Sequence, residues 1–260
     1  MLVPSFRPAI VSLALSVAFL GGCAQKPVAL KTVKNDAGQQ YTVYAVDDWS
    51  HPEQESEMEV ADSVMPLTSL VPADLVNAQF RGHDRKIAKT SISDADTEDF
   101  QSLSAFTRSL PSDDDMRNHD PALEEDASFD RVEEENRNVK VAAYVCAIKF
   151  ETDSDWHIIV AGDKRCNGPT FFNVEVSGLP KRNAADYATL LQARKDLATL
   201  LADDLPGSGT YRRYDPPLHV QIEGSIFYDI DHAPGVVGPT GMRPSTAWEI
   251  HPVTSIVAIE

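Results

Sequence analysis

The chain has 260 residues, 42% of them hydrophobic and 24% charged, which is enough for one or two domains with a hydrophobic core. Its net charge is −17, and the acidic excess lies mainly in residues 1–136, which hold 25 acidic and 11 basic residues. Residues 137–260 are nearly balanced, with 15 acidic and 12 basic residues. Because an acidic chain repels phosphates, the composition disfavours nucleic acid as a partner.

The N-terminal residues have the layout of a secretory signal. Arg7 provides positive charge, residues 9–20 form an apolar run, and small residues follow it. The run is shorter than the roughly 20 apolar residues that a transmembrane helix needs. It ends in the tetrapeptide LGGC at residues 20–23, which resembles the lipobox of bacterial lipoproteins.

The lipobox resemblance implies a cellular address. In that family the cysteine is joined to diacylglycerol and signal peptidase cuts in front of it, so residues 1–22 would be removed and Cys23 would carry acyl chains such as palmitate. More than one acyl chain makes membrane anchoring durable. In such lipoproteins, an aspartate directly after the lipidated cysteine resembles an inner-membrane retention signal. Ala24 therefore favours an outer-membrane lipoprotein that faces the periplasm. An ordinary cleaved signal with a chance cysteine is the alternative.

The chain between Cys23 and residue 136 is expected to be a tether. Residues 28–46 predict a β-hairpin, because apolar residues alternate on two arms around the turn sequence NDAG. Two strands alone are marginal in water, so this hairpin needs something to pack against. Residues 47–136 are rich in Asp, Glu, Ser and Pro, and such a composition buries too little apolar area to offset the entropy of ordering. We therefore expect residues 23–136 to form a mostly disordered, acidic, lipid-anchored tether.

Residues 137–260 are expected to fold as one domain. The predicted elements are strands at 139–150, 156–161, 171–176, 218–228 and 246–259, and a helix at 183–205. Three strands, a helix and two strands follow one another in the order of the OB-fold, a five-stranded, partly open Greek-key barrel. The sequence thus predicts a mainly β, OB-like domain, and a small α+β sheet is the alternative.

The C-terminal part also resembles a group of bacterial proteins that share a W-E-I-H-P motif, here residues 248–252, and an upstream acidic-x-His segment, here residues 155–157. Residues 110–120 are similar to the same group. The resemblance covers roughly residues 110–260 and supports an OB-type barrel. It implies no activity and no functional residues.

Two pairs of side chains could carry chemistry. Residues i and i+2 of a strand point to the same side, so Asp155 shares a face with His157, and Glu249 with His251. Carboxylate and imidazole ligands suit zinc, iron or manganese, so the four residues predict a divalent metal site if the two strands lie close together. The alternative is that each histidine satisfies backbone groups at a strand end. The remaining polar-loop histidines, which need no special role, are His51, His83, His119 and His232.

Two further cysteines remain after the lipobox. An oxidising compartment permits a disulfide between Cys146 and Cys166, and two buried free thiols are the alternative. Spacing alone cannot decide between them, because a disulfide requires the two Cα atoms to come within about 7 Å.

The sequence favours a non-catalytic lipoprotein whose OB-like domain binds an envelope peptide, glycan or protein. The expected binding face is formed by residues 156–161 and 171–176, the second and third strands. A metal-dependent hydrolase that uses the two acidic–histidine pairs is one alternative, and a structural role in an envelope assembly is another. The distance between the paired side chains tests the shared metal site, because metal–ligand bonds are about 2.0–2.3 Å long.

Overall fold

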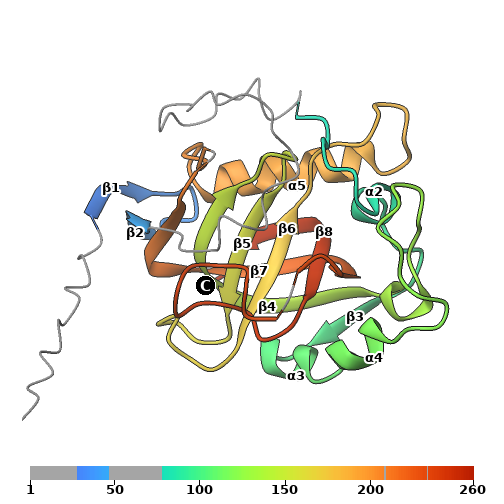
Figure 1. Ribbon diagram of the computed structural model, residues 1–260. Coiled ribbons are helices and arrows are strands. Elements are labelled where there is room, and N and C mark those ends of the chain that lie inside the picture. Colours follow the sequence, from blue (N-terminus) through green and yellow to red (C-terminus); the bar gives the residue numbers. More distant parts are fainter. Residues whose placement is uncertain (1–27, 47–77, 208, 233) are drawn as a thin grey trace, which may run out of the picture.

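The computed structural model describes residues 28–46, 78–207, 209–232 and 234–260 (Figure 1). The predicted signal peptide and Cys23 lie outside the described residues. One sheet of eight strands dominates the structure, which confirms the mainly β class. The strands are β1 (Val28–Lys34), β2 (Gln40–Val46), β3 (Thr97–Phe100), β4 (Asn138–Phe150), β5 (Trp156–Ala161), β6 (Phe171–Val176), β7 (Tyr211–Tyr228) and β8 (Trp248–Ala258). The helices are α2 (Lys86–Lys89), α3 (Leu103–Thr107), α4 (Asp113–Arg117), the 3₁₀ turn η1 (Glu133–Glu135) and α5 (Tyr187–Leu200).

The strand order is β1-β2-β7-β8-β6-β5-β4-β3, and β7 also pairs with β4. Five strands therefore form a closed sequence of pairings, in which β4 pairs with β5, β5 with β6, β6 with β8, β8 with β7, and β7 with β4. The β6–β8 pair is parallel and the other four pairs are antiparallel. Outside this ring, β1 and β2 extend the sheet beyond β7, and β3 extends it beyond β4.

The main core lies on one side of these five strands. Alternate residues of β5 and β6 point into it, including Trp156, Ile158 and Val174, together with Trp248 of β8. Helix α5 packs against β8 and β6 and contributes Ala193 and other buried apolar residues of its stripe. In Figure 1, α5 lies across one end of β5 and β6. Both tryptophans are thus core anchors, and the opposite sides of the same strands are left for other side chains.

The strands at 156–161 and 171–176 have the predicted bounds, whereas the later elements differ. Helix α5 ends at Leu200 because Ala202 and Asp203 adopt left-handed backbone angles, with φ of 51° and 60°. β7 begins at Tyr211 and not at the predicted residue 218, and its first residues pair with β2.

The strand β8 runs without a break through Pro252, although proline cannot donate a hydrogen bond to a neighbouring strand. It does so because the β7–β8 register shifts around Gly224, and bulges are where sheets accept proline. A Cβ at Gly224 would lie 2.5 Å from the Pro252 carbonyl oxygen, so only glycine permits this close approach.

The hairpin of β1 and β2 lies where the sequence predicts one, and the sheet supplies the packing that it needs. β2 pairs with the start of β7, and Tyr41 packs edge-on against Tyr214 with ring centroids 5.5 Å apart. Both rings are buried in the main core.

Residues 78–136 differ from the expectation of a disordered tether. They contain α2, β3, α3, α4 and η1, and Leu103, Phe106 and Met116 are buried in the main core. The physical reason is that a few well-placed apolar residues suffice when an existing sheet receives them, although the average composition remains acidic and polar. Residues 47–77 of the predicted tether lie outside the described residues.

A buried ion pair holds this segment in place. Arg85 binds both oxygens of Glu135, at 2.7 and 2.6 Å, and both side chains are 1% exposed or less. Glu135 also accepts hydrogen bonds from the backbone N–H groups of Tyr228 and Val132, and the Arg85 guanidinium lies 4.7 Å from the centroid of the Phe227 ring. The pair thereby joins the segment before α2, the turn η1 and the end of β7.

The structure joins Cys146 and Cys166 by a disulfide, with their Cα atoms 5.8 Å apart. The bridge lies in a second, smaller apolar cluster, on the side of the sheet away from the main core, with Ile159, Phe171 and Met242.

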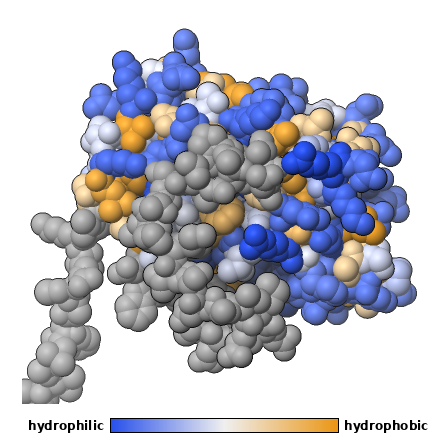
Figure 2. Space-filling model, turned by 90° about the horizontal axis from the view of Figure 1, so that it is seen from above, coloured by the Kyte–Doolittle hydropathy of each residue, from blue (hydrophilic) through white to orange (hydrophobic). Residues whose placement is uncertain are grey.

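In the part of the chain that the structure describes, no helix is long and apolar enough to cross a membrane. Seen from above, the described surface is a mosaic of hydrophilic residues with small hydrophobic areas between them (Figure 2). The large apolar side chains that are exposed, Leu30, Ile87 and Val257, belong to three different elements.

We expect Glu135→Gln to lower the free energy of unfolding by about 3–5 kcal/mol, because it leaves the buried Arg85 without its counter-charge. Urea unfolding at neutral pH measures the change. The matched control is Glu133→Gln, at an exposed position of the same turn, which should change stability by less than about 0.5 kcal/mol. Equal effects of the two substitutions would contradict the role assigned to the pair.

Candidate metal centre

Charged and polar side chains gather on the sides of β5, β6 and β8 that face away from the main core. His157 of β5 lies directly opposite Glu175 of β6, and Asn173 of β6 lies directly opposite Glu249 of β8. Each of these side chains alternates with core residues, so the register of the three neighbouring strands places them on one face, in two adjacent rows. All four are buried.

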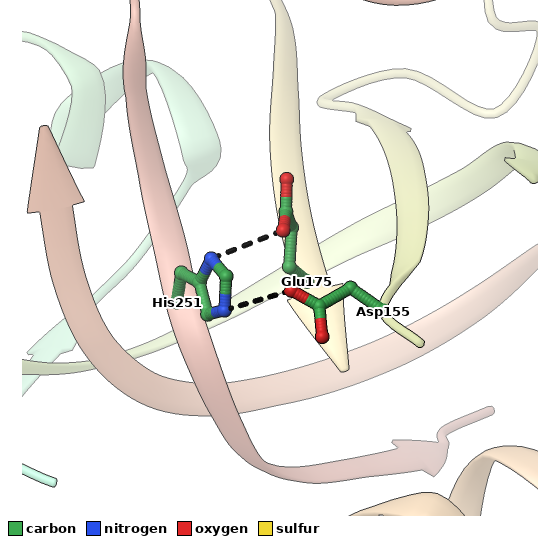
Figure 3. A group of neighbouring side chains, drawn as sticks. All are labelled: Asp155, Glu175 and His251. Carbon is green, nitrogen blue, oxygen red and sulfur yellow. Dashed lines mark ion pairs between the residues drawn. The ribbon is translucent and has the colours of Figure 1, made fainter. Parts of the chain in front are cut away.

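Each ring nitrogen of His251 faces a carboxylate, one of Glu175 and the other of Asp155 (Figure 3). His251 Nε2 is 3.3 Å from Asp155 Oδ2, and His251 Nδ1 is 3.0 Å from Glu175 Oε2. Glu249 Oε2 is 3.6 Å from the same Nδ1. His251 and Asp155 are fully buried and the two glutamate side chains are 2% exposed, so no bulk water screens these charges.

Asn173 orients the two glutamates. Its Nδ2 donates to Glu175 Oε1 at 2.7 Å and to Glu249 Oε1 at 2.8 Å. With both Oε1 atoms held by one amide, both Oε2 atoms are left on the side of His251 Nδ1. Two carboxylate oxygens, Glu175 Oε2 and Glu249 Oε2, therefore lie near the same imidazole nitrogen.

The group extends through His157. Its Nε2 is 2.8 Å from Glu175 Oε1, and its Nδ1 is 3.6 Å from Glu151 Oε1. Lys149 Nζ lies 3.1 Å from the same Glu151 oxygen. His157 therefore reaches the other predicted ligands through Glu175.

A second group adjoins the first, after the end of β7. His232 Nδ1 is 3.1 Å from Asp229 Oδ2 and 3.6 Å from Glu249 Oε1. Lys89 Nζ, at the end of α2, is 3.2 Å from the same Asp229 oxygen. The rings of His157 and His232 stand edge to face with their centroids 6.0 Å apart, so the two groups form one continuous buried cluster.

Two segments contact β5 or the residues that follow β6. The chain before α2 runs along the residues that follow β6, with the Phe80 N–H donating to the Leu179 carbonyl. A Cβ at Gly178 would lie 2.7 Å from the Cα of Phe80, so glycine is required for this contact. On the other side, Met242 and Gly238 of the β7–β8 connection pack near Ile159. As a result, every residue of β5 and β6 is buried, and the face expected to bind a ligand is covered.

Several of the convergent atoms lack hydrogen-bond partners of proper geometry among the described residues. They are both nitrogens of His251, Asp155 Oδ2, Asn173 Oδ1, Glu249 Oε2 and His232 Nδ1. The histidine nitrogens among these atoms have carboxylates 3.0–3.6 Å away, at ion-pair distance. The ligand atoms of Asp155, Glu175 and His251 lie within 4.8 Å of one another, and so do those of Asp229, His232 and Glu249.

The carboxylates strongly favour protonated histidines in the metal-free cluster. Burial alone lowers the pKa of His157, but Glu175 and Glu151 outweigh it and raise the pKa to about 9. Burial also lowers the pKa of His251, but Glu175 and Asp155 outweigh it and hold that pKa well above its ordinary value. For Asp153, burial and the neighbouring Asp155 raise the pKa to about 7.

The four predicted residues lie in this one cluster. Asp155 and Glu249 contact His251 directly, and His157 joins them through Glu175. The sequence reasoning missed Glu175, Asn173, Asp229 and His232. The alternation used for β5 and β8 also applies to β6, and it could have identified Glu175 and Asn173. No local pattern marks Asp229 and His232, because the turn after β7 brings them there.

Comparisons with protein-family models, with curated proteins and with solved structures find no match to this chain.

We expect the metal-free protein to lose stability as the pH rises from about 7 to above 9. The folded-state pKa of His157 is about 9 and its unfolded value is about 6.5, so the stabilisation by its positive charge is complete below pH 6.5 and disappears through pH 9. The gap between these two values corresponds to about 3 kcal/mol. Unfolding in chelator between pH 6 and 10 measures it.

The variant His157→Gln should reduce this pH dependence, although His251, whose pKa is also raised, keeps part of it. His83→Gln, at an exposed position, should leave it unchanged. A stability that is constant or rises over the same pH interval would rule out a buried imidazolium.

Proposed function

We propose that this protein is a lipid-anchored, extracytoplasmic lipoprotein whose folded domain binds a divalent transition-metal ion in the buried His251 cluster. The observation that supports the metal most directly is the set of buried, convergent oxygen and nitrogen atoms around His251 without hydrogen-bond geometry. Imidazole with carboxylates suits zinc, manganese or iron.

The metal is best placed at His251 Nδ1. Two glutamate oxygens approach this nitrogen, from Glu175 and Glu249, whereas Asp155 alone approaches Nε2. An imidazole gives one nitrogen to a metal and commonly donates its other N–H to a carboxylate. In this assignment Glu175, Glu249 and His251 are ligands, and Asp155 orients the ring.

Electrostatics supports a cation at this place. Asp155, Glu175, Glu249 and Asp229 bring four carboxylates into a region where none is more than 3% exposed. Burying unpaired charge costs several kcal/mol per ion, so cations must accompany these groups. Protonated histidines supply them in the metal-free protein, and a divalent ion with neutral histidines would supply them in the loaded one.

We further propose that the five strands β4, β5, β6, β7 and β8 form an OB-type barrel. The closed sequence of pairings, the parallel pair between its third and fifth strands, and α5 after the third strand support this assignment. Since β5 and β6 are buried on both faces, ligand binding at the usual OB face has no support here, and the metal cluster occupies part of that face instead.

A lipid on Cys23 would hold this domain close to the membrane. Residue 28, where β1 begins, is five residues after Cys23, and five residues span at most about 18 Å. The anchored domain would thus lie at the bilayer surface, without a long tether between lipid and sheet.

We expect zinc to raise the melting temperature of the chelator-treated protein. At a free concentration 100 times the dissociation constant, a single bound ion adds about 2.7 kcal/mol, or about 5–10 °C for a domain of this size. Glu175→Gln should abolish the shift. Asp155→Asn should weaken zinc binding by about 10–100-fold, as expected for an orienting residue.

Glu98→Gln is the control, since Glu98 is an exposed partner of Arg137 and should leave the shift unchanged. Absence of bound metal by elemental analysis, together with an unchanged melting temperature in zinc, manganese and iron(II), would overturn the metal proposal.

We expect Cys23→Ser to move the protein from the membrane fraction to the soluble fraction, because the acyl chains are the only anchor in this proposal. Cell fractionation followed by immunoblotting measures this, and metabolic labelling with palmitate checks the lipid. The control is Cys146→Ser combined with Cys166→Ser, which leaves the lipobox intact and should stay with the membrane. Unchanged membrane association of Cys23→Ser would refute lipid anchoring.

A further inference from the structure

Glu249 lies between two histidines and offers each of them a different oxygen. Its Oε2 is 3.6 Å from His251 Nδ1, and its Oε1 is 3.6 Å from His232 Nδ1. A buried carboxylate placed in this way can bridge two metal ions, as in enzymes that use a pair of divalent cations. The second histidine has its own carboxylate, because Asp229 Oδ2 is 3.1 Å from His232 Nδ1.

A second observation that points to a ligand is that two buried atoms have ion-pair partners but no hydrogen bond. His232 Nδ1 and Glu249 Oε2 are buried atoms without hydrogen-bond geometry to any described residue, although carboxylates or imidazoles are within 3.1–3.6 Å of them. The Glu249 side chain is 2% exposed, so water does not satisfy it from outside. A bound cation would take both atoms as ligands.

We propose that Asp229, His232 and Glu249 hold a second divalent cation, and that Glu249 bridges it to the ion at His251. This inference rests on the proposed metal function and extends it to a two-cation centre. Zinc and manganese both suit a set of one imidazole and two carboxylates.

The two positions differ in their access to solvent. The His251 side chain is fully buried, whereas that of His232 is 32% exposed. Structural metal sites are closed, and catalytic sites keep an open coordination position for water or substrate. We call the ion at His251 the inner ion and the ion at His232 the outer ion. The inner ion is therefore assigned a structural role, and the outer ion is the one that can bind water or an anionic oxygen ligand.

Lys89 must be compatible with the outer cation, since its Nζ is 3.2 Å from Asp229 Oδ2. A carboxylate has about four acceptor positions, so Asp229 can accept from Lys89 and still bind a metal. The nearby ammonium would weaken cation binding by repulsion. The outer site should consequently be the weaker of the two.

Zinc stoichiometry tests the proposal. The full-length protein in detergent is stripped with chelator and titrated with zinc, and bound zinc per chain is measured by elemental analysis and by calorimetry. The expected result is two ions with unequal affinities. His232→Gln and Asp229→Asn should each retain only the tight ion, and Lys89→Met should tighten the weak one by roughly tenfold, because it removes the repelling ammonium.

His83→Gln serves as the control, because His83 is exposed and its ion-pair partner is Asp84. Circular dichroism and thermal unfolding in chelator establish that each variant is folded. Replacing zinc with manganese gives a second readout, since two bridged ions show exchange coupling in electron paramagnetic resonance, and His232→Gln should abolish it.

The possible failures can be told apart. A single ion that is lost in Glu175→Gln and unaffected by His232→Gln would refute the second position and leave the first intact. No bound ion in any form would refute the metal function itself. Two ions in both His232→Gln and Asp229→Asn would also refute this assignment, because the second ion would then bind elsewhere.

Discussion

The register of β5, β6 and β8 is the constraint on which the rest of the structure depends. It places His157 opposite Glu175 and Asn173 opposite Glu249, and it sends the alternate residues of the same strands into the main core. A slip of one residue would exchange the two sides, so that tryptophans faced the charged cluster and carboxylates faced the core. The hydrophobic core and the polar cluster therefore enforce the same alignment from opposite faces of the sheet.

Burying this cluster requires a cover, and the acidic segment before β4 supplies one part of it. The Arg85–Glu135 pair holds that segment at the end of β7. Lys89, in the same segment, forms an ion pair with Asp229. A charge that would be screened at the surface is thereby kept in a region of low dielectric, where interactions with cations are strong. The segment thus brings Arg85 and Lys89 to buried carboxylates.

The proposed anchor and the proposed metal centre make different demands on the chain. A lipid on Cys23 would hold the domain near the bilayer through the short connection to β1, an edge strand of the sheet. The proposed metal centre lies on β5, β6, β8 and the turn after β7, where the His232 side chain is partly exposed. A ligand from outside would reach the proposed metal centre at the turn after β7. The lipid anchor at Cys23 is not part of that turn.

The sequence by itself determined the strands with clear alternation, the hairpin at residues 28–46, and the pairing of Asp155 with His157 and of Glu249 with His251 on common faces. These are local properties, because alternation depends on neighbours two residues apart. Only the tertiary structure decided that both pairs meet, since their approach depends on β6 lying between β5 and β8. The tertiary structure also decided that residues 78–136 are ordered. A polar segment becomes ordered when a sheet elsewhere in the chain accepts its few apolar side chains and its buried ion pair.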